Sequence, residues 1–230
     1  MKVVVLLSGG VDSSTCLALA VKQHCAENVY ALNIMYGQKH SKELSCAQKI
    51  ADYYHVPYHL IDLSLIFSKS NCSLLQHSDQ PIIHKSYNEQ LKDLGGSGTV
   101  STYVPFRNGL MLSCAASFAQ SIGASAVIYG AHADDAAGRA YPDCTPEFVE
   151  YMNKAIYEGT GRELVIEAPF LNSNKAGIVK QGLELKVPYE LTWSCYEGND
   201  QPCGSCGTCI DRKKAFELNG AVDPLLKSTK

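Results

Sequence analysis

Several marks of other protein classes are missing from this 230-residue sequence. No apolar run approaches the roughly 20 residues that a membrane-spanning helix needs. Acidic and basic residues nearly balance, with a formal net charge of −3, so no broad basic surface is expected to attract nucleic acid or an anionic membrane. The first apolar run, residues 3–7, is too short for a secretion signal. We therefore expect a cytoplasmic protein that has neither a membrane nor a nucleic acid as its partner.

Cysteine, by contrast, is abundant. Ten cysteines occur without an export signal, so metal ligation or simple burial is expected in place of disulfides. Four of them are clustered: Cys195, Cys203, Cys206 and Cys209. Four soft ligands at this spacing favour tetrahedral Zn²⁺, with an iron–sulfur cluster as the alternative. The basic residues that follow, Arg212, Lys213 and Lys214, either neutralise such a centre or form a solvated helix face. A closed Cys₄ site has no open coordination position, which predicts a structural role.

Apolar segments alternate with helical patterns, which predicts an α/β fold with a doubly wound, five-stranded parallel sheet. The expected strands are residues 3–7, 29–35, 57–63, 126–129 and 164–168. The expected helices cover residues 17–24, 47–54, 111–122, 146–157, 175–186 and 211–219. The pattern breaks down over residues 66–102, which are rich in Ser, Asn, His and Gly and are predicted to be an inserted, mobile loop region. We expect one domain over residues 1–190 and a cysteine-containing segment, residues 191–230, packed on it.

A glycine-rich loop, SGGVDSS at residues 8–14, follows the first expected strand. Gly9 and Gly10 allow the backbone to approach a phosphate closely, and the helix that follows presents free N–H groups to an anion. The ordinary alternative is a Gly-Gly turn with a serine cap. The loop lacks the lysine of a P-loop. Since ligands bind at the carboxyl ends of parallel strands, residues 8–14, 36–39 and 130–135 are expected to face one crevice.

The loop resembles the SGGxDS signature of the PP-loop ATP pyrophosphatase superfamily and matches it at every defined position. The resemblance implies a fold like that of the adenine nucleotide alpha hydrolases, in which the loop holds the pyrophosphate of ATP during adenylyl transfer to a carboxylate or carbonyl oxygen. The missing lysine agrees with this chemistry, because a P-loop lysine supports γ-phosphoryl transfer. Asp12 is then the expected ligand of Mg²⁺, a cation that prefers carboxylate and phosphate oxygens.

The resemblance also assigns roles to individual residues. The expected ATP contacts are Leu7, Ser8, Gly9, Gly10, Val11, Asp12, Ser13, Ser14, Tyr36, Lys39 and Gly130. The expected catalytic residues are Asp12, Ser13, Arg107 and Lys175. Arg107 could reach the phosphates or the developing negative charge. A position on the surface, in contact with water alone, is the ordinary alternative for Arg107 and for the two lysines.

Three further segments narrow the family: VPFRN at 104–108, YPDC at 141–144 and VPYELTWSC at 187–195. Together with the cysteine spacing they resemble the 7-cyano-7-deazaguanine synthase (QueC) family, over nearly the whole chain except residues 66–100. The resemblance implies a ligase that forms C–N bonds and converts 7-carboxy-7-deazaguanine and ammonia into the nitrile preQ0, with ATP, in queuosine biosynthesis. Adenylation makes the oxygen a good leaving group, ammonia gives the amide, and a second activation gives the nitrile. No cysteine nucleophile is needed, so Cys144 is expected to be non-catalytic.

The resemblance places substrate recognition in the segments around YPDC. The expected substrate contacts are Phe106, Asp135, Tyr141, Pro142 and Asp143. Asp143 is the expected acceptor for the N–H groups of the base, and Phe106 or Tyr141 the stacking face. Two departures touch this region, because many family members have Gly at the position of Phe106, and a longer link here brings in Arg139.

Three alternatives remain open at the level of sequence. One is a relative that stops at the amide or joins the activated carboxylate to another amine. The second is a tRNA-modifying PP-loop enzyme with an iron–sulfur cluster, which the missing basic patch disfavours. The third is a regulatory protein that senses ATP or zinc. A homodimer is expected, because α/β enzymes of this size often form one.

Overall fold

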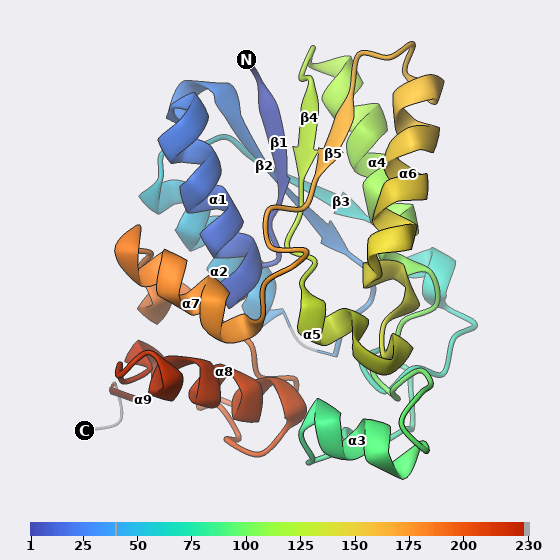
Figure 1. Ribbon diagram of the computed structural model, residues 1–230, viewed down its shortest axis with the longest axis vertical. Helices are drawn as coiled ribbons and strands as arrows, with labels where there is room; N and C mark the ends of the chain where they lie inside the picture. The colour runs from blue at the N-terminus through green and yellow to red at the C-terminus, as the bar shows by residue number, and fades with distance from the viewer. Residues whose placement is uncertain (40, 228–230) are drawn as a thin grey trace.

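The computed structural model describes residues 1–39 and 41–227 (Figure 1). Residues 228–230, the end of the expected segment 191–230, lie outside the described residues. Five parallel strands form one sheet in the order β3-β2-β1-β4-β5, which confirms the predicted fold class. The strands are β1 Val3–Leu6, β2 Val29–Met35, β3 Tyr58–Asp62, β4 Ala126–Ile128 and β5 Val165–Glu167.

Helices cover both faces of this sheet. The α-helices are α1 Val11–His24, α2 Lys42–Tyr53, α3 Tyr87–Asp93, α4 Arg107–Ser121, α5 Ala133–Ala136, α6 Pro146–Gly159, α7 Lys175–Glu184, α8 Gly207–Leu218 and α9 Pro224–Lys227. Single 3₁₀ turns occur at Ala26–Asn28, Ser64–Phe67, Ala137–Arg139, Pro142–Cys144 and Tyr189–Leu191. Helices α1, α2 and α7 cover one face, and α4 and α6 cover the other (Figure 1).

Strand β1 is apolar at every position because it lies in the middle of the sheet, with a helical layer on each side. Val3 and Val5 belong to the core that includes Leu17 of α1. Val4 points the other way and belongs to the core that includes Leu112 of α4. Because side chains alternate along a strand, one short apolar run contributes residues to two separate cores.

The expected strands agree with the observed ones to within two residues at each end, and β2 has the expected bounds. Helix α8 begins four residues earlier than expected. Helix α3 was not expected at all, because it lies inside the region 66–102. Ser86 caps it, since the Ser86 hydroxyl accepts a hydrogen bond from the Glu89 N–H and the Glu89 carboxylate accepts one from the Ser86 N–H. This capping box stabilises the first turn of α3.

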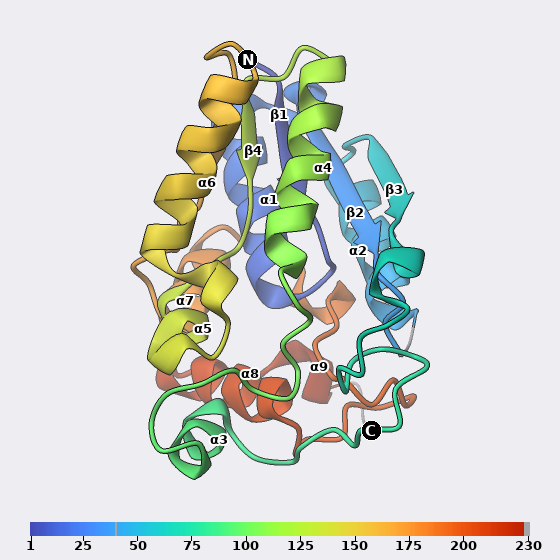
Figure 2. The same cartoon turned by 90° about the vertical axis from the view of Figure 1, so that its right-hand side faces the viewer.

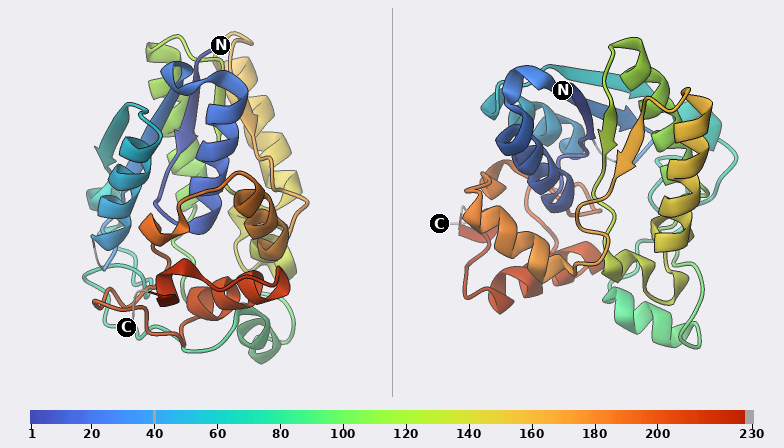
Figure 3. Two further views of the ribbon diagram at one scale, coloured as in Figure 1. Left: turned by 90° about the vertical axis from the view of Figure 1, so that its left-hand side faces the viewer. Right: turned by 45° about the horizontal axis from the view of Figure 1, so that its top comes forward.

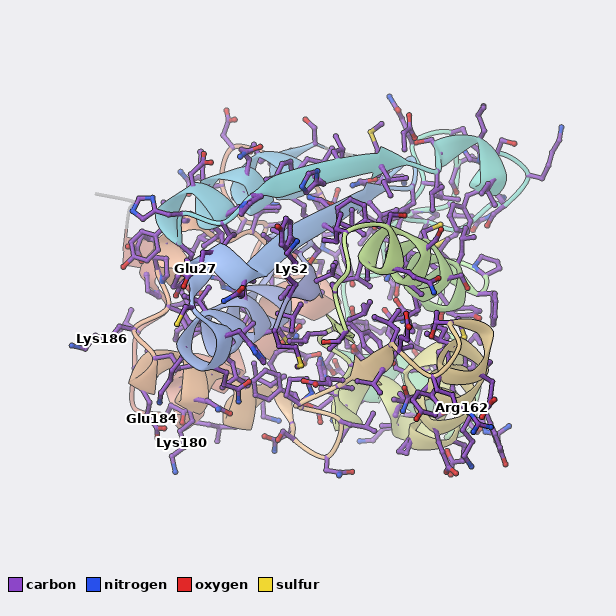
Figure 4. The ribbon with its side chains drawn as sticks, turned by 90° about the horizontal axis from the view of Figure 1, so that it is seen from above. Lys2, Glu27, Arg162, Lys180, Glu184 and Lys186 are labelled. Carbon is purple, nitrogen blue, oxygen red and sulfur yellow. The ribbon has the colours of Figure 1, made fainter. Side chains whose placement is uncertain are left out.

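Helices α3 and α8 lie across the carboxyl ends of the strands (Figures 1 and 2). Helix α7 lies between α1 and α8, so α8 is joined to the sheet through that layer (Figure 3). The opposite end carries exposed charged side chains such as Lys2, Glu27 and Arg162 (Figure 4). Within the described ranges no helix has both the length and the apolar character needed to cross a membrane.

Candidate functional site

A cavity of about 240 Å³ lies at the carboxyl ends of β1, β2 and β4, and residues at the starts of α3 and α8 help to line it. Its wall includes eight of the expected ATP contacts: Leu7, Ser8, Gly10, Val11, Asp12, Ser13, Tyr36 and Gly130. It also includes all four expected catalytic residues: Asp12, Ser13, Arg107 and Lys175. The structure thus brings residues from five elements and loops to one crevice, next to the point where the strand order of the sheet reverses.

Three expected ATP contacts, Gly9, Ser14 and Lys39, are not part of the cavity wall. The ammonium group of Lys39 donates a hydrogen bond to the Gln80 carbonyl (3.0 Å), which turns it towards the inserted region. Ser14 is fully buried within α1. Gly9 has a φ of +87°, and a Cβ there would lie 2.4 Å from the carbonyl oxygen of Glu43. Gly9 therefore serves the close packing of the loop against α2.

The loop presents donors to the cavity. Helix α1 begins at Val11, and its first residues have no side-chain cap, since Gly10 occupies the cap position. The Ser13 hydroxyl lies 3.1 Å from the Ser8 hydroxyl and accepts a hydrogen bond from the Ser8 N–H. Gly130 closes the other side, because a Cβ on it would lie 3.1 Å from the Cβ of Asp12. Free N–H groups and hydroxyls at a helix start form a binding site for phosphate.

Asp12 and Lys175 form an ion pair in the cavity wall. The Lys175 ammonium group lies 2.5 Å from Oδ2 of Asp12. Burial alone would raise the pKa of Asp12, but Lys175 and His132 outweigh it and hold this pKa below its ordinary value. The other carboxylate oxygen, Oδ1, is buried and has no hydrogen-bond partner among the described residues. A charged carboxylate with one free oxygen beside a phosphate site fits a Mg²⁺ ligand.

His132 lies in the segment 130–135 that was expected at this crevice, but the sequence analysis gave it no role, and it sits behind the cavity wall without lining it. It is 1% exposed, and its Nε2 lies 3.3 Å from Asp135 Oδ2 and 3.8 Å from Asp12 Oδ2. Neither ring nitrogen has a well-aligned hydrogen-bond partner in the part of the chain that the structure describes. Its place directly after the expected fourth strand was the available signal. The ring separates two carboxylates that would otherwise repel each other.

Arg107 lies opposite the glycine loop. Its guanidinium carbon is 4.7 Å from the centre of the Tyr36 ring, and no carboxylate of the described residues pairs with it within 4.0 Å. Glu43 of α2, which the sequence analysis did not select, lines the same part of the cavity. Burial raises the pKa of Glu43 to about 7, and Arg107 offsets this only in part. The positive charge of Arg107 is therefore not paired with a carboxylate of the described residues and is available to a ligand.

Replacing Glu43 by glutamine is expected to raise the melting temperature more at pH 8 than at pH 5. The folded pKa of about 7 exceeds the ordinary value of 4.5, so the native state loses stability as the pH rises through this window. Glutamine does not ionise, which removes that loss above pH 7. Thermal melts of the variant and the parent at both pH values measure this, with the exposed Glu147→Gln as control. Equal shifts at both pH values would contradict the assigned pKa.

Of the expected substrate contacts, Asp135 and Tyr141 line the cavity, whereas Phe106, Pro142 and Asp143 do not. Asp143 is 3% exposed, and its Oδ2 accepts a hydrogen bond from the Asn108 N–H (2.8 Å) at the start of α4. Phe106 is 57% exposed, with a φ of +53°, and its ring packs at a right angle on Phe148. The two residues serve the start of α4 in this structure, one as a cap and one as a packing contact.

Two other residues near YPDC have settled positions. Arg139 is exposed, with a φ of +59°, and does not belong to the cavity wall. Cys144 lines the cavity but is 4% exposed, and burial raises the pKa of its thiol well above the ordinary value. A buried thiol that stays protonated is a poor nucleophile.

The four clustered cysteines form a compact group whose sulfur atoms all lie within 4.8 Å of one another. Backbone N–H groups point at two of the sulfurs: the Cys203 N–H at Cys195 Sγ and the Cys206 N–H at Cys203 Sγ, both at 3.3 Å. Such donors stabilise thiolates, and four thiolates at this separation can hold one metal ion. The donor set therefore fits a closed tetrahedral site.

The basic residues after this cluster have other partners. Arg212 is buried, and its guanidinium forms two hydrogen bonds with the carboxylate of Asp223 at 2.7 and 2.9 Å. Further bonds reach the Thr192 hydroxyl and the Tyr189 carbonyl. Lys213 is exposed and lies 3.8 Å from Glu217 on α8. Arg212 thus ties α8 to the turn at Tyr189–Leu191, and its charge is balanced by Asp223.

Comparison with solved structures finds the same overall fold in another protein. NMN synthetase from Francisella tularensis superimposes with a TM-score of 0.52 at 16% sequence identity, covering 98% of this chain and 81% of that one. The sequence model of the family described as "Queuosine biosynthesis protein QueC" matches residues 2–220. The chain belongs to the QueC family.

Two relatives show how closely the family is matched. The protein named 7-cyano-7-deazaguanine synthase from Archaeoglobus fulgidus is 44% identical over 227 residues, which are 98% of this chain and 90% of the relative. The protein of the same name from Caldicellulosiruptor bescii is 43% identical over 225 residues, which are 98% of this chain and 96% of the relative. The match therefore extends through the glycine loop, the inserted region and the cysteine cluster alike.

Proposed function

We propose that this protein is an ATP-dependent ligase that converts 7-carboxy-7-deazaguanine and ammonia into 7-cyano-7-deazaguanine. The observation that carries the proposal is the joint placement of Asp12, Lys175 and Arg107 with the glycine loop in one cavity. The relatives that bear the name of this enzyme support it over the whole chain. The family match favours this function over a tRNA-modifying enzyme, an amide-forming relative or a regulatory protein.

The residues divide the work of activation. The N–H groups at the start of α1 and the hydroxyls of Ser8 and Ser13 bind the pyrophosphate that leaves. Asp12 would hold Mg²⁺, and the bound ion would supply positive charge beside the phosphates. Lys175 and Arg107 add positive charge from opposite sides of the cavity. The first activation transfers the adenylyl group of ATP to a carboxylate oxygen and releases pyrophosphate, and ammonia then displaces AMP, with loss of a proton, to give the amide. The second activation adenylylates the amide oxygen in the same way, and the amide nitrogen loses its two protons as AMP leaves and the nitrile forms.

The remaining residues bind substrate and hold the site in place. The Asp135 carboxylate faces the cavity and is the proposed acceptor for N–H groups of the deazaguanine, beside the Tyr141 ring. Asp143 and Phe106 hold the start of α4, which carries Arg107. The four cysteines are proposed to bind Zn²⁺ in a structural role. We further propose that residues 191–230 act as a segment that packs on the domain of residues 1–190, and that the protein is a homodimer.

The proposed reaction is tested by incubating the protein with ATP, Mg²⁺, ammonia and 7-carboxy-7-deazaguanine while AMP, ADP and the nitrile are measured together. AMP and nitrile are expected to accumulate with no ADP. An amide as the final product, or ADP in place of AMP, would overturn the proposed reaction. Light scattering in solution gives the oligomeric state from the same preparation.

Replacing Cys144 by serine is expected to leave at least about a third of the turnover rate. The thiol is buried and protonated, and the proposed chemistry uses no sulfur nucleophile. The Asn108 amide, 3.1 Å from the sulfur, can donate to a serine hydroxyl equally well. Steady-state nitrile formation measures the effect. Complete loss of activity in a folded Cys144→Ser variant would indicate covalent catalysis.

A further inference from the structure

Three tyrosines from distant parts of the chain meet in the wall of the cavity. Tyr87 begins α3, Tyr141 follows α5, and Tyr196 follows the first clustered cysteine. The hydroxyls of Tyr87 and Tyr196 are 2.6 Å apart, so one donates to the other. The rings of Tyr87 and Tyr141 meet edge to face, with 5.8 Å between their centres. The contact places the inserted region and the cysteine segment at the same wall of the site.

This wall suits a flat heterocycle with N–H groups on its edge. Asp135 joins the three tyrosines, because its carbonyl accepts a hydrogen bond from the Tyr141 N–H and its carboxylate lines the same cavity. Aromatic rings present apolar surface to a base, and a carboxylate accepts its N–H groups. Of the residues expected from the sequence to do this, Asp135 and Tyr141 line the cavity, whereas Phe106 and Asp143 do not.

Helix α3 is held at the wall by the cysteine segment. The two ring nitrogens of His84 lie 2.6 Å from the Ser205 hydroxyl and 2.7 Å from the Glu197 carboxylate. A Cβ on Gly207 would lie 3.2 Å from both the Lys85 carbonyl oxygen and Cε1 of Tyr87, so the start of α8 packs closely against the residues at the start of α3. Figures 1 and 2 show these two helices side by side.

The contacts fall next to the clustered cysteines themselves. Tyr196 directly follows Cys195, and Gly207 directly follows Cys206. Ile82, just before α3, packs in one apolar cluster with Cys195 and Cys206. Any group that fixes the four sulfurs therefore also fixes the backbone on which Tyr87 and Tyr196 rest.

We infer that Tyr87 and Tyr196 are substrate-positioning residues, and that the cysteine segment sets the affinity for the deazaguanine by holding α3 at the cavity. The inference rests on the proposed function, since it concerns the substrate of that same site. It gives the inserted region a role that neither the glycine loop nor the cysteine cluster requires. The Tyr87–Tyr196 hydrogen bond and the close contact at Gly207 involve no residue of the glycine loop, and neither Asp12 nor Arg107 takes part in them.

The test compares Tyr87→Phe and Gly207→Ala with the parent protein. Tyr87→Phe loses the bond to Tyr196, and Gly207→Ala adds a Cβ so close to Lys85 and Tyr87 that they must shift by a few tenths of an ångström. Both are expected to raise KM for 7-carboxy-7-deazaguanine by roughly 3- to 10-fold, the effect of about one lost hydrogen bond, and to change KM for ATP less than 2-fold. Isothermal titration calorimetry of the deazaguanine gives the same ratio without turnover. Tyr151→Phe, on an exposed ring of α6, is the matched control.

The outcomes distinguish a failure of the proposed function from a failure of this inference alone. A parent protein that forms no nitrile and does not bind the deazaguanine would overturn the proposed function and this inference with it. An active parent whose Tyr87→Phe variant keeps its KM for the deazaguanine would overturn the inference alone. Equal rises of both KM values would show a general loss of structure, which also contradicts it. Metal content and melting temperature of Tyr87→Phe are expected to match the parent.

Discussion

Replacing Asp12 by alanine is expected to lower the rate of AMP formation by roughly 10²- to 10³-fold, the loss seen when one preorganised electrostatic group is removed. The variant loses the carboxylate, one oxygen of which has no hydrogen-bond partner among the described residues. It also leaves the Lys175 ammonium group without the carboxylate that lies 2.5 Å away in the parent. An unpaired, partly buried cation is costly, so Lys175 is expected to turn towards solvent.

The measurement is steady-state AMP release with saturating ATP, Mg²⁺ and substrate. Asp52→Ala, on the exposed side of α2, is the matched control and should retain the parent rate. Because the pKa of Asp12 is held below its ordinary value of 3.8, the ion pair contributes stability above that pH and loses it only at lower pH. The variant should therefore differ from the parent in thermal melts at pH 7, and the difference should shrink as the pH falls below 3.8. Full activity in Asp12→Ala would overturn the assigned role of the loop.

The sheet could be predicted from the sequence because each strand is recognised by the residues that form it. Central parallel strands need apolar residues on both faces, and residues 3–7 show that run without interruption. The glycine loop was readable because Gly9 must adopt a positive φ next to α2, which restricts the residue type. Both features leave a direct trace in the residues that form them.

Helix α3 and the cavity wall formed by Tyr87, Tyr141 and Tyr196 are harder to predict from the sequence. The Ser86–Glu89 capping box was present in the sequence, but the burial of Tyr87 comes from contact with Tyr196, more than one hundred residues later. Asp143 shows the same limit. Neighbouring carboxylates look alike in a sequence, and only the 3₁₀ turn Pro142–Cys144 turns Asp143 to the Asn108 N–H. Which aspartate faces a cavity is a property of packing.

Replacing Cys206 by serine is expected to abolish metal binding and to lower the melting temperature by about 6 to 12 °C, which corresponds to a loss of roughly 3 kcal/mol for a chain of this size. That loss is a small part of the roughly 10–16 kcal/mol with which zinc-finger peptides bind Zn²⁺. The full amount is not expected, because the Arg212–Asp223 pair still ties α8 to the domain.

The variant separates two descriptions of the cysteine segment. If the metal only holds the C-terminal segment in place, Cys206→Ser is less stable than the parent. At temperatures below its melting temperature it then keeps the affinity of the parent for the deazaguanine. If the segment holds α3 at the cavity, affinity for the deazaguanine falls while ATP still binds, because Gly207 and Tyr196 are adjacent to ligand cysteines. Metal analysis, thermal melts and calorimetry on one preparation give the metal content, the melting temperature and the affinity for the deazaguanine. Cys25→Ser, at an exposed cysteine outside the cluster, is the control. An unchanged metal content would contradict the four-cysteine site itself.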